Sequence, residues 1–88
     1  MEILQYELKV EGKQSIFMPA QAKVLTVQMR HEKPCIWVEV NPEYAPEFRI
    51  FETFYAGQKM IEDMGVERKY IGTYQINDGV TCHVYERK

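Results

Sequence analysis

The residues best suited to chemistry in this chain are arginines and aromatic side chains. A guanidinium binds phosphate through paired hydrogen bonds, and an aromatic ring stacks on a planar base. By strand alternation, Arg49, Phe51 and Tyr55 share one face of a single segment. The competing interpretation is that aromatic side chains on strands fill the core and that single arginines lie on the surface. The sequence therefore predicts a site for a planar anionic ligand, formed by Arg30, Trp37, Arg49, Phe51, Tyr55 and Tyr74.

Catalysis is poorly supported by the sequence. Ser15 is the only serine, and it lacks the flanking glycines of a nucleophile elbow. Cys82 and His83 are adjacent, so on a strand their side chains point to opposite faces, whereas a contact between Cys35 and His83 in three dimensions stays open. There is no glycine-rich phosphate loop, and the cysteines and histidines lack the close spacing of a metal site. We expect no enzymatic activity, no cofactor and no metal ion.

The elements that position these residues are expected to be short β-strands. Alternation of apolar and polar residues, with Gly, Pro and Asn-Asp-Gly between segments, is typical of strands joined by turns. The expected strands are residues 2–10, 14–18, 22–30, 34–40, 47–56, 69–76 and 80–86. This pattern predicts an all-β domain over residues 1–88, a small, mostly antiparallel sandwich or barrel of about seven strands. At most one short helical turn is expected, near residues 58–64.

Two of the expected strands are apolar on both faces, whereas the others alternate. In residues 22–30 the side chains of Leu25, Val27 and Met29 are expected to face inward, and in residues 2–10 Val10 is expected to share one face with the other apolar residues of the strand. In residues 34–40 and 47–56 apolar side chains occur on both faces, so both faces should be covered. Because a chain of 88 residues has little core to cover them with, we expect a homo-oligomer. The alternative is that the loop at residues 57–68 covers the second face.

Composition and charge exclude several broad classes of protein. The net charge of −2 argues against a surface for duplex nucleic acid, and no apolar run is long enough to span a membrane. The N-terminal residues do not resemble a secretory signal, so we expect a cytoplasmic protein. In a reducing compartment the two cysteines are expected to be free, buried thiols.

Several blocks of the sequence resemble a known family. They are residues 6–8, 18–28, 33–37 (Lys-Pro-Cys-Ile-Trp), 40–42, 48–51, 70–75 (Tyr-Ile-Gly-Thr-Tyr-Gln) and 83–86. The chain resembles, from about residue 3 to residue 86, a family of short uncharacterised proteins found mainly in tailed phages and prophages. At residues 52–57 it reads Glu-Thr-Phe-Tyr-Ala-Gly, where members of that family commonly carry a Gly-Thr-Gly-like turn.

The resemblance implies a phage context but no activity or catalytic residues. Small phage proteins without enzymatic motifs include counter-defence factors, and some of these trap a nucleotide immune signal in pockets between subunits. By analogy of context, we expect a non-enzymatic counter-defence protein that sequesters such a nucleotide in pockets between its own subunits, in the cytosol of the host cell. The alternatives are an inhibitor or modulator of a host protein, such as a host defence protein, and a virion or assembly accessory protein.

Overall fold

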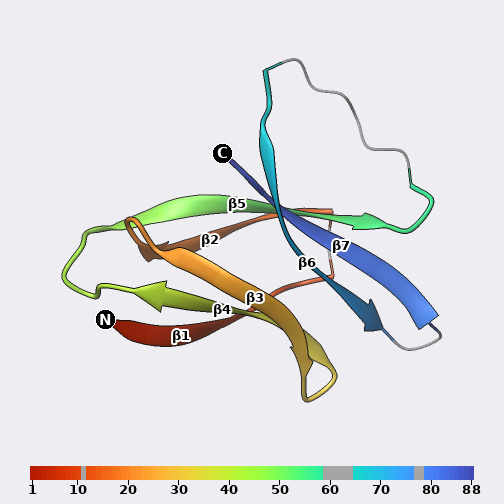
Figure 1. Ribbon diagram of the computed structural model, residues 1–88, viewed down its shortest axis with the longest axis horizontal. Helices are drawn as coiled ribbons and strands as arrows, with labels where there is room; N and C mark the ends of the chain where they lie inside the picture. Colours follow the sequence, from red (N-terminus) through yellow and green to blue (C-terminus); the bar gives the residue numbers. More distant parts are fainter. Residues whose placement is uncertain (11, 59–64, 77–78) are drawn as a thin grey trace.

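A computed structural model describes residues 1–10, 12–58, 65–76 and 79–88, which form seven antiparallel strands in two sheets (Figure 1). The all-β prediction is confirmed. The expected helical turn falls on residues 59–64, which lie outside the described residues. The strands are β1 (Glu2–Glu7), β2 (Lys13–Pro19), β3 (Lys23–Arg30), β4 (Lys33–Val40), β5 (Pro46–Tyr55), β6 (Arg68–Ile76) and β7 (Val80–Arg87).

The two sheets have the strand orders β1-β4-β3 and β2-β5-β7-β6. β5 and β6 each pair antiparallel with β7, so they run parallel to one another with β7 between them. The smallest dimension of the Cα trace is 16 Å, as expected for two sheets stacked face to face at about 10 Å. β3 of the first sheet packs on β6 of the second, which closes the sandwich on that side.

The core lies between the sheets and is filled by alternate residues of each strand. β4 contributes Ile36, Val38 and Val40, all completely buried, and β7 contributes Cys82 and Val84. Both cysteines are free and buried, as predicted. The register Leu4↔Val38 and Tyr6↔Ile36 in β1, and Val24↔Val38 in β3, places the apolar side chains of the three strands on one face.

Two predictions of side-chain direction are wrong. Leu25 was expected to face inward but is 42% exposed, because the register of β3 shifts between Val24 and Thr26. Such a bulge inserts one extra residue, so the inward positions become Val24 and Val27. Val10 is exposed as well, because β1 ends at Glu7 and the chain leaves the sheet before it.

β4 is covered on both faces, as predicted. Cys35 points away from the core but is only 7% exposed. A hydrogen bond from Arg30 of β3 to Gln5 of β1 spans β4, and Lys33 lies 3.5 Å from the Glu7 carboxylate. The aliphatic parts of long polar side chains cover apolar surface while their charged ends stay in water. Much of the second face of β4 is therefore covered within one chain.

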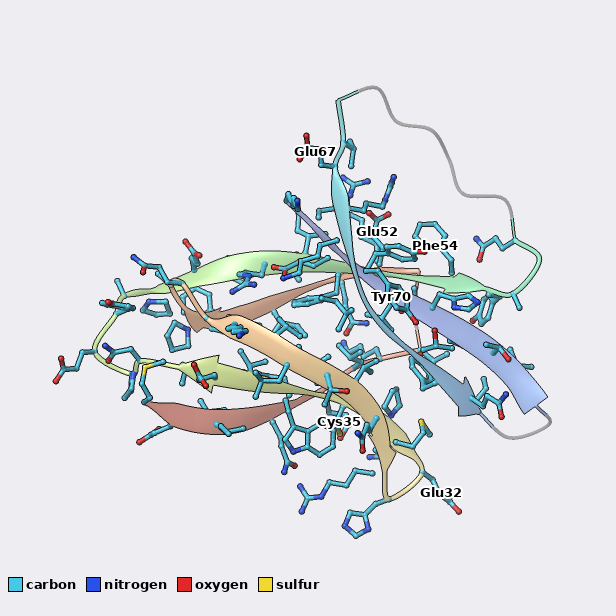
Figure 2. All side chains as sticks on the ribbon, in the orientation of Figure 1. Glu32, Cys35, Glu52, Phe54, Glu67 and Tyr70 are labelled. Atoms are coloured by element: carbon cyan, nitrogen blue, oxygen red, sulfur yellow. The ribbon has the colours of Figure 1, made fainter. Side chains whose placement is uncertain are left out.

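Two positions show tight backbone geometry. The β3–β4 hairpin turns through His31 and Glu32, whose φ angles of 50° and 65° are those of primed hairpin turns, in which glycine and asparagine are preferred (Figure 2).

At the contact of β3 with β6, a Cβ on Gly72 would lie 2.6 Å from Cγ1 of Val27. The close approach of these two strands depends on that glycine.

Candidate functional site

The six residues predicted to bind a ligand do not converge in one place. Arg30 and Trp37 lie on the outer face of the β1-β4-β3 sheet, where Gln5 is opposite Trp37 and accepts a hydrogen bond from Arg30. Phe51 and Tyr74 are buried between the sheets, and they are 1% and 4% exposed. The remaining two lie on β5, with Tyr55 exposed at its C-terminal end and Arg49 half-buried near its start.

A hollow of the described surface lies where β5 and β7 separate. β7 pairs with β5 only over Phe51–Tyr55, while β2 pairs with β5 back to Pro46. Figure 1 shows the start of β6 and the C-terminal end of β7 rising away from β5. We call this opening the fork. It holds a pocket of about 720 Å³, lined by Glu47, Phe48, Arg49, Ile50, Gly65, Val66, Lys69, Glu86, Arg87 and Lys88.

The fork is basic, although the chain as a whole is acidic. Its lining has four basic side chains and two acidic ones, whereas the net charge of the chain is −2. Lys69 and Lys88 are exposed to solvent and are among the residues that line the pocket. The volume lies within the range of about 300–1,000 Å³ that is usual for small-molecule sites.

An exposed aromatic ring forms one wall of the fork. Phe48 is 69% exposed, and its ring lies 4.6 Å from the ring of Phe17 on β2, centroid to centroid. This packing on one side limits the positions that the Phe48 side chain adopts. Its remaining surface is available to a planar group, for which an aromatic ring is a suitable stacking partner. Ile50 and Val66 add apolar surface to the same pocket.

Backbone groups of β5 also face the fork. The amide of Ala56 donates to β7, whereas the amide of Thr53 donates toward β2. Because alternate residues of a strand direct their N–H and C=O groups to opposite sides, the even-numbered residues of β5 point toward β7. β7 pairs with β5 only from Phe51 onward. The amide of Phe48 therefore points into the fork, with no strand opposite it among the described residues.

Arg49 forms the back of the fork and is held by three hydrogen bonds. Its Nε and Nη2 atoms donate to the two carboxylate oxygens of Glu86, with Nη2 2.8 Å from Oε1, and Nη1 donates to the Ala22 carbonyl oxygen at 2.6 Å. The hydrogen bond to Glu86 raises the pKa of Arg49, which outweighs the effect of burial. The guanidinium thus connects β5, β7 and the β2–β3 corner, and most of its donors are used within the chain.

A second ion-pair cluster lies on the outer face of the same sheet, near Phe54 and Tyr70 (Figure 2). The Glu52 carboxylate accepts hydrogen bonds from Arg68 Nε at 2.9 Å and from Arg87 Nε at 2.6 Å. Burial alone would raise the pKa of Glu52, but the hydrogen bonds and positive charges of the two arginines outweigh it, and the pKa lies below its usual value. This cluster fixes Arg87 at the edge of the fork.

A hydroxyl–histidine pair lies on the outer face of the same sheet. Thr73 Oγ1 is 2.9 Å from His83 Nδ1 and is also hydrogen-bonded to the Tyr70 hydroxyl. Such a pair resembles the arrangement that activates a hydroxyl nucleophile. Neither Thr73 nor His83 is among the residues that line the fork. Within the described residues, no group of three or more His, Cys, Asp and Glu side chains is placed to hold a metal ion.

The sequence analysis did not identify most residues of the fork as ligand-binding residues. Arg49 was identified, but Phe48, Lys69, Arg87 and Lys88 were not, because the fork depends on the point at which β7 stops pairing with β5. The available signal was a basic segment at each end of the last hairpin, Arg68-Lys69 and Arg87-Lys88. Antiparallel pairing brings these two segments together.

Comparison with known proteins identifies a family and no activity. A family model described as a domain of unknown function (DUF7352) matches residues 1–88. The curated proteins and the solved structures contain no match to the chain. In the described part of the chain, no helix has the length and apolar character needed to cross a membrane.

Proposed function

The chain belongs to the DUF7352 family, whose function is unknown, and we propose that it binds a phosphorylated, nucleotide-like molecule in the fork without converting it. The observation that carries this proposal is the combination of a basic pocket with an exposed aromatic wall. Phosphate groups meet the ammonium groups of Lys69 and Lys88, and a planar base stacks on Phe48. The amide of Phe48, which has no strand opposite it among the described residues, supplies a neutral donor to the same anion.

Sequestration of a nucleotide immune signal is the biological role within this proposal. It rests on the phage resemblance of the sequence, and it requires tight binding but no catalytic group. Because the fork is formed by β5, β6 and β7 of one chain, the site proposed here belongs to each copy rather than to the space between copies. A protein with this role acts in the cytosol of a host cell.

Native mass spectrometry with a mixed pool of signalling nucleotides tests the proposal. We expect one mass increment per chain, with an affinity that falls as salt is added, because exposed charges are screened. Calorimetry with the retained nucleotide then compares Lys69→Gln and Lys88→Gln with Lys23→Gln, which removes a lysine from β3, outside the fork lining.

Each fork variant is expected to weaken binding about ten-fold, equivalent to about 1.4 kcal/mol, and the β3 control is expected to leave it unchanged. Phe48→Ala should weaken binding by a similar factor while costing little stability, because the ring is mostly exposed. Failure to retain any nucleotide would refute the proposal. Retention that is insensitive to all three fork variants would place the site elsewhere on the protein.

A further inference from the structure

β2 is an edge strand whose outer side is open. It pairs with β5 on one side, and within the described residues no strand pairs with it on the other. The amide of Thr53 on β5 donates to the carbonyl of Gly12, just before β2. By alternation along the register Ser15↔Ile50 and Phe17↔Phe48, the even-numbered residues of β2 bond to β5. The N–H and C=O groups of Ser15 and Phe17 therefore point outward, away from the sheet.

This open edge has little of the usual protection against pairing. Edge strands are commonly protected by charged side chains, proline or bulges. In β2 the only charge is Lys13 at its start, and the only proline is Pro19 at its end. No register shift interrupts its pairing with β5. Between these two ends, the outward backbone groups of the strand form a continuous row with no described strand opposite them.

The β2 sequence is complementary to itself when two copies run antiparallel about Ile16. In that register Ser15 lies opposite the partner's Phe17, and both residues exchange backbone hydrogen bonds, since both point outward. Lys13 lies opposite the partner's Pro19, so no like charges face one another. Pro19 has no N–H to donate, but its carbonyl accepts from the partner's Lys13. The two-fold symmetry repeats each of these bonds, as in other isologous pairs.

Two exposed aromatic rings lie beside this edge on the outer face of the sheet. Phe17 is 52% exposed and Phe48 is 69% exposed. A phenylalanine buries on the order of 150–250 Å² when fully covered, so the half-exposed ring of Phe17 on the edge strand leaves roughly 100 Å² of aromatic surface per chain for a partner, while Phe48 on the next strand keeps its free surface in the fork. In the symmetric register Phe17 of each copy lies beside the other copy's β2. Burial of this surface adds an apolar contribution to the backbone hydrogen bonds.

We propose that two copies of this chain join through the outer edges of their β2 strands, with Ile16 at the two-fold axis, to form one continuous eight-stranded sheet. The fork lies on the opposite side of β5 from β2, so both forks stay open in the dimer. The two Phe17 rings supply less than half of the roughly 1,000 Å² that a specific interface needs, so the dimer is expected to be reversible and concentration-dependent. The inference does not depend on the proposed function.

Sedimentation velocity over a range of protein concentrations tests the dimer. Ser15→Pro removes an outward N–H without removing a bond to β5, and edge strands tolerate proline. We expect the wild type and Ser15→Ala to dimerise, and Ser15→Pro and Phe17→Ser to sediment as monomers at least ten-fold above the wild-type midpoint. Circular dichroism checks that both monomeric variants keep their β structure.

Cysteine trapping tests the register and does not depend on the proline variant. The proposed pairing places Ser15 about 5.5 Å, Cα to Cα, from the partner's Phe17, within the range for a disulfide, whereas Ser15 lies roughly 8 Å from the partner's Ser15. A mixture of Ser15→Cys and Phe17→Cys chains should give a disulfide-linked pair, and each variant alone should not. A wild type that is monomeric at all concentrations would overturn the inference. So would a dimer that persists in Ser15→Pro, or a mixture that fails to cross-link.

Discussion

Replacing Arg49 with methionine tests how much the ion pair at the back of the fork contributes to the stability of the domain. Arg49 makes two hydrogen bonds to Glu86 and one to the Ala22 carbonyl, and the side chains of Arg49 and Glu86 are 17% and 11% exposed. Methionine keeps most of the side-chain volume but removes all three donors. The Glu86 carboxylate then stays largely buried without its partner.

The expected cost follows from the burial of the carboxylate that is left behind. Removing one member of a buried ion pair typically destabilises a protein by about 3–5 kcal/mol, because an uncompensated charge remains. A domain of this length has a total stability of roughly 4–13 kcal/mol. Arg49→Met is therefore expected to remove about a quarter or more of the free energy of unfolding.

Urea unfolding, followed by the fluorescence of Trp37 and by circular dichroism, measures this loss. The double variant Arg49→Met/Glu86→Leu is the matched control, since replacing both members of a buried pair with apolar residues is often neutral. We expect the double variant to unfold within about 1 kcal/mol of the wild type. The reasoning is refuted if Arg49→Met costs less than about 1 kcal/mol, or if the double variant is as unstable as the single variant.

Three further predictions concern the core and the outer face of the larger sheet. Gly72→Ala should cost about 1–3 kcal/mol because its methyl group meets Val27, and Val27→Ala in the same chain should recover part of that loss in urea unfolding; additive losses would contradict the contact. Burial raises the pKa of Tyr74 to about 12, above its unfolded value of 10.0, so its contribution to stability is present below pH 10 and declines as the pH rises above that value. Tyr74→Phe should flatten this alkaline decline, because phenylalanine keeps the buried ring but cannot ionise; an unchanged decline in a urea series at rising pH would contradict the role of Tyr74. The pKa of Glu52 lies below its unfolded value of 4.5, so its contribution is complete above pH 4.5 and is lost as the pH falls through the folded pKa. Glu52→Gln should be less stable than the wild type at neutral pH and should lose less stability on acidification; an unchanged acid profile in a urea series would contradict the role of its two arginine partners.

Strand content and most strand boundaries were predictable because they depend on local patterns. The alternation of apolar and polar residues along β1 and β7 indicates which side of a half-buried strand faces the core, and Pro or Gly indicates where a strand ends. The two-faced character of β4 was also visible, since Cys35 and Trp37 alternate with Ile36 and Val38. These features require only that each residue be compared with its neighbours in the chain.

Side-chain direction at Leu25 was not predictable, because a bulge depends on the partner strand. β3 takes one extra residue against β4 between Val24 and Thr26, and the sequence there has two adjacent apolar residues, Val24 and Leu25, either of which could face inward. Only the pairing with β4 shows that Leu25 points to solvent while Val27 faces Gly72. A one-residue shift reverses every side chain beyond it.

By itself the sequence determined an all-β chain, a buried pair of thiols and a supply of arginines and aromatic residues. Tertiary structure decided which of those residues are used within the fold and which meet solvent. Arg49, Phe51 and Tyr55 alternate along one strand, yet one is held by Glu86, one is buried and one is exposed, because β7 and the opposite sheet cover only parts of β5. The fork and the open edge of β2 exist for the same physical reason. Backbone groups of a strand bond to a neighbouring strand only where that strand extends alongside them, and the point at which the pairing ends depends on contacts between distant parts of the chain.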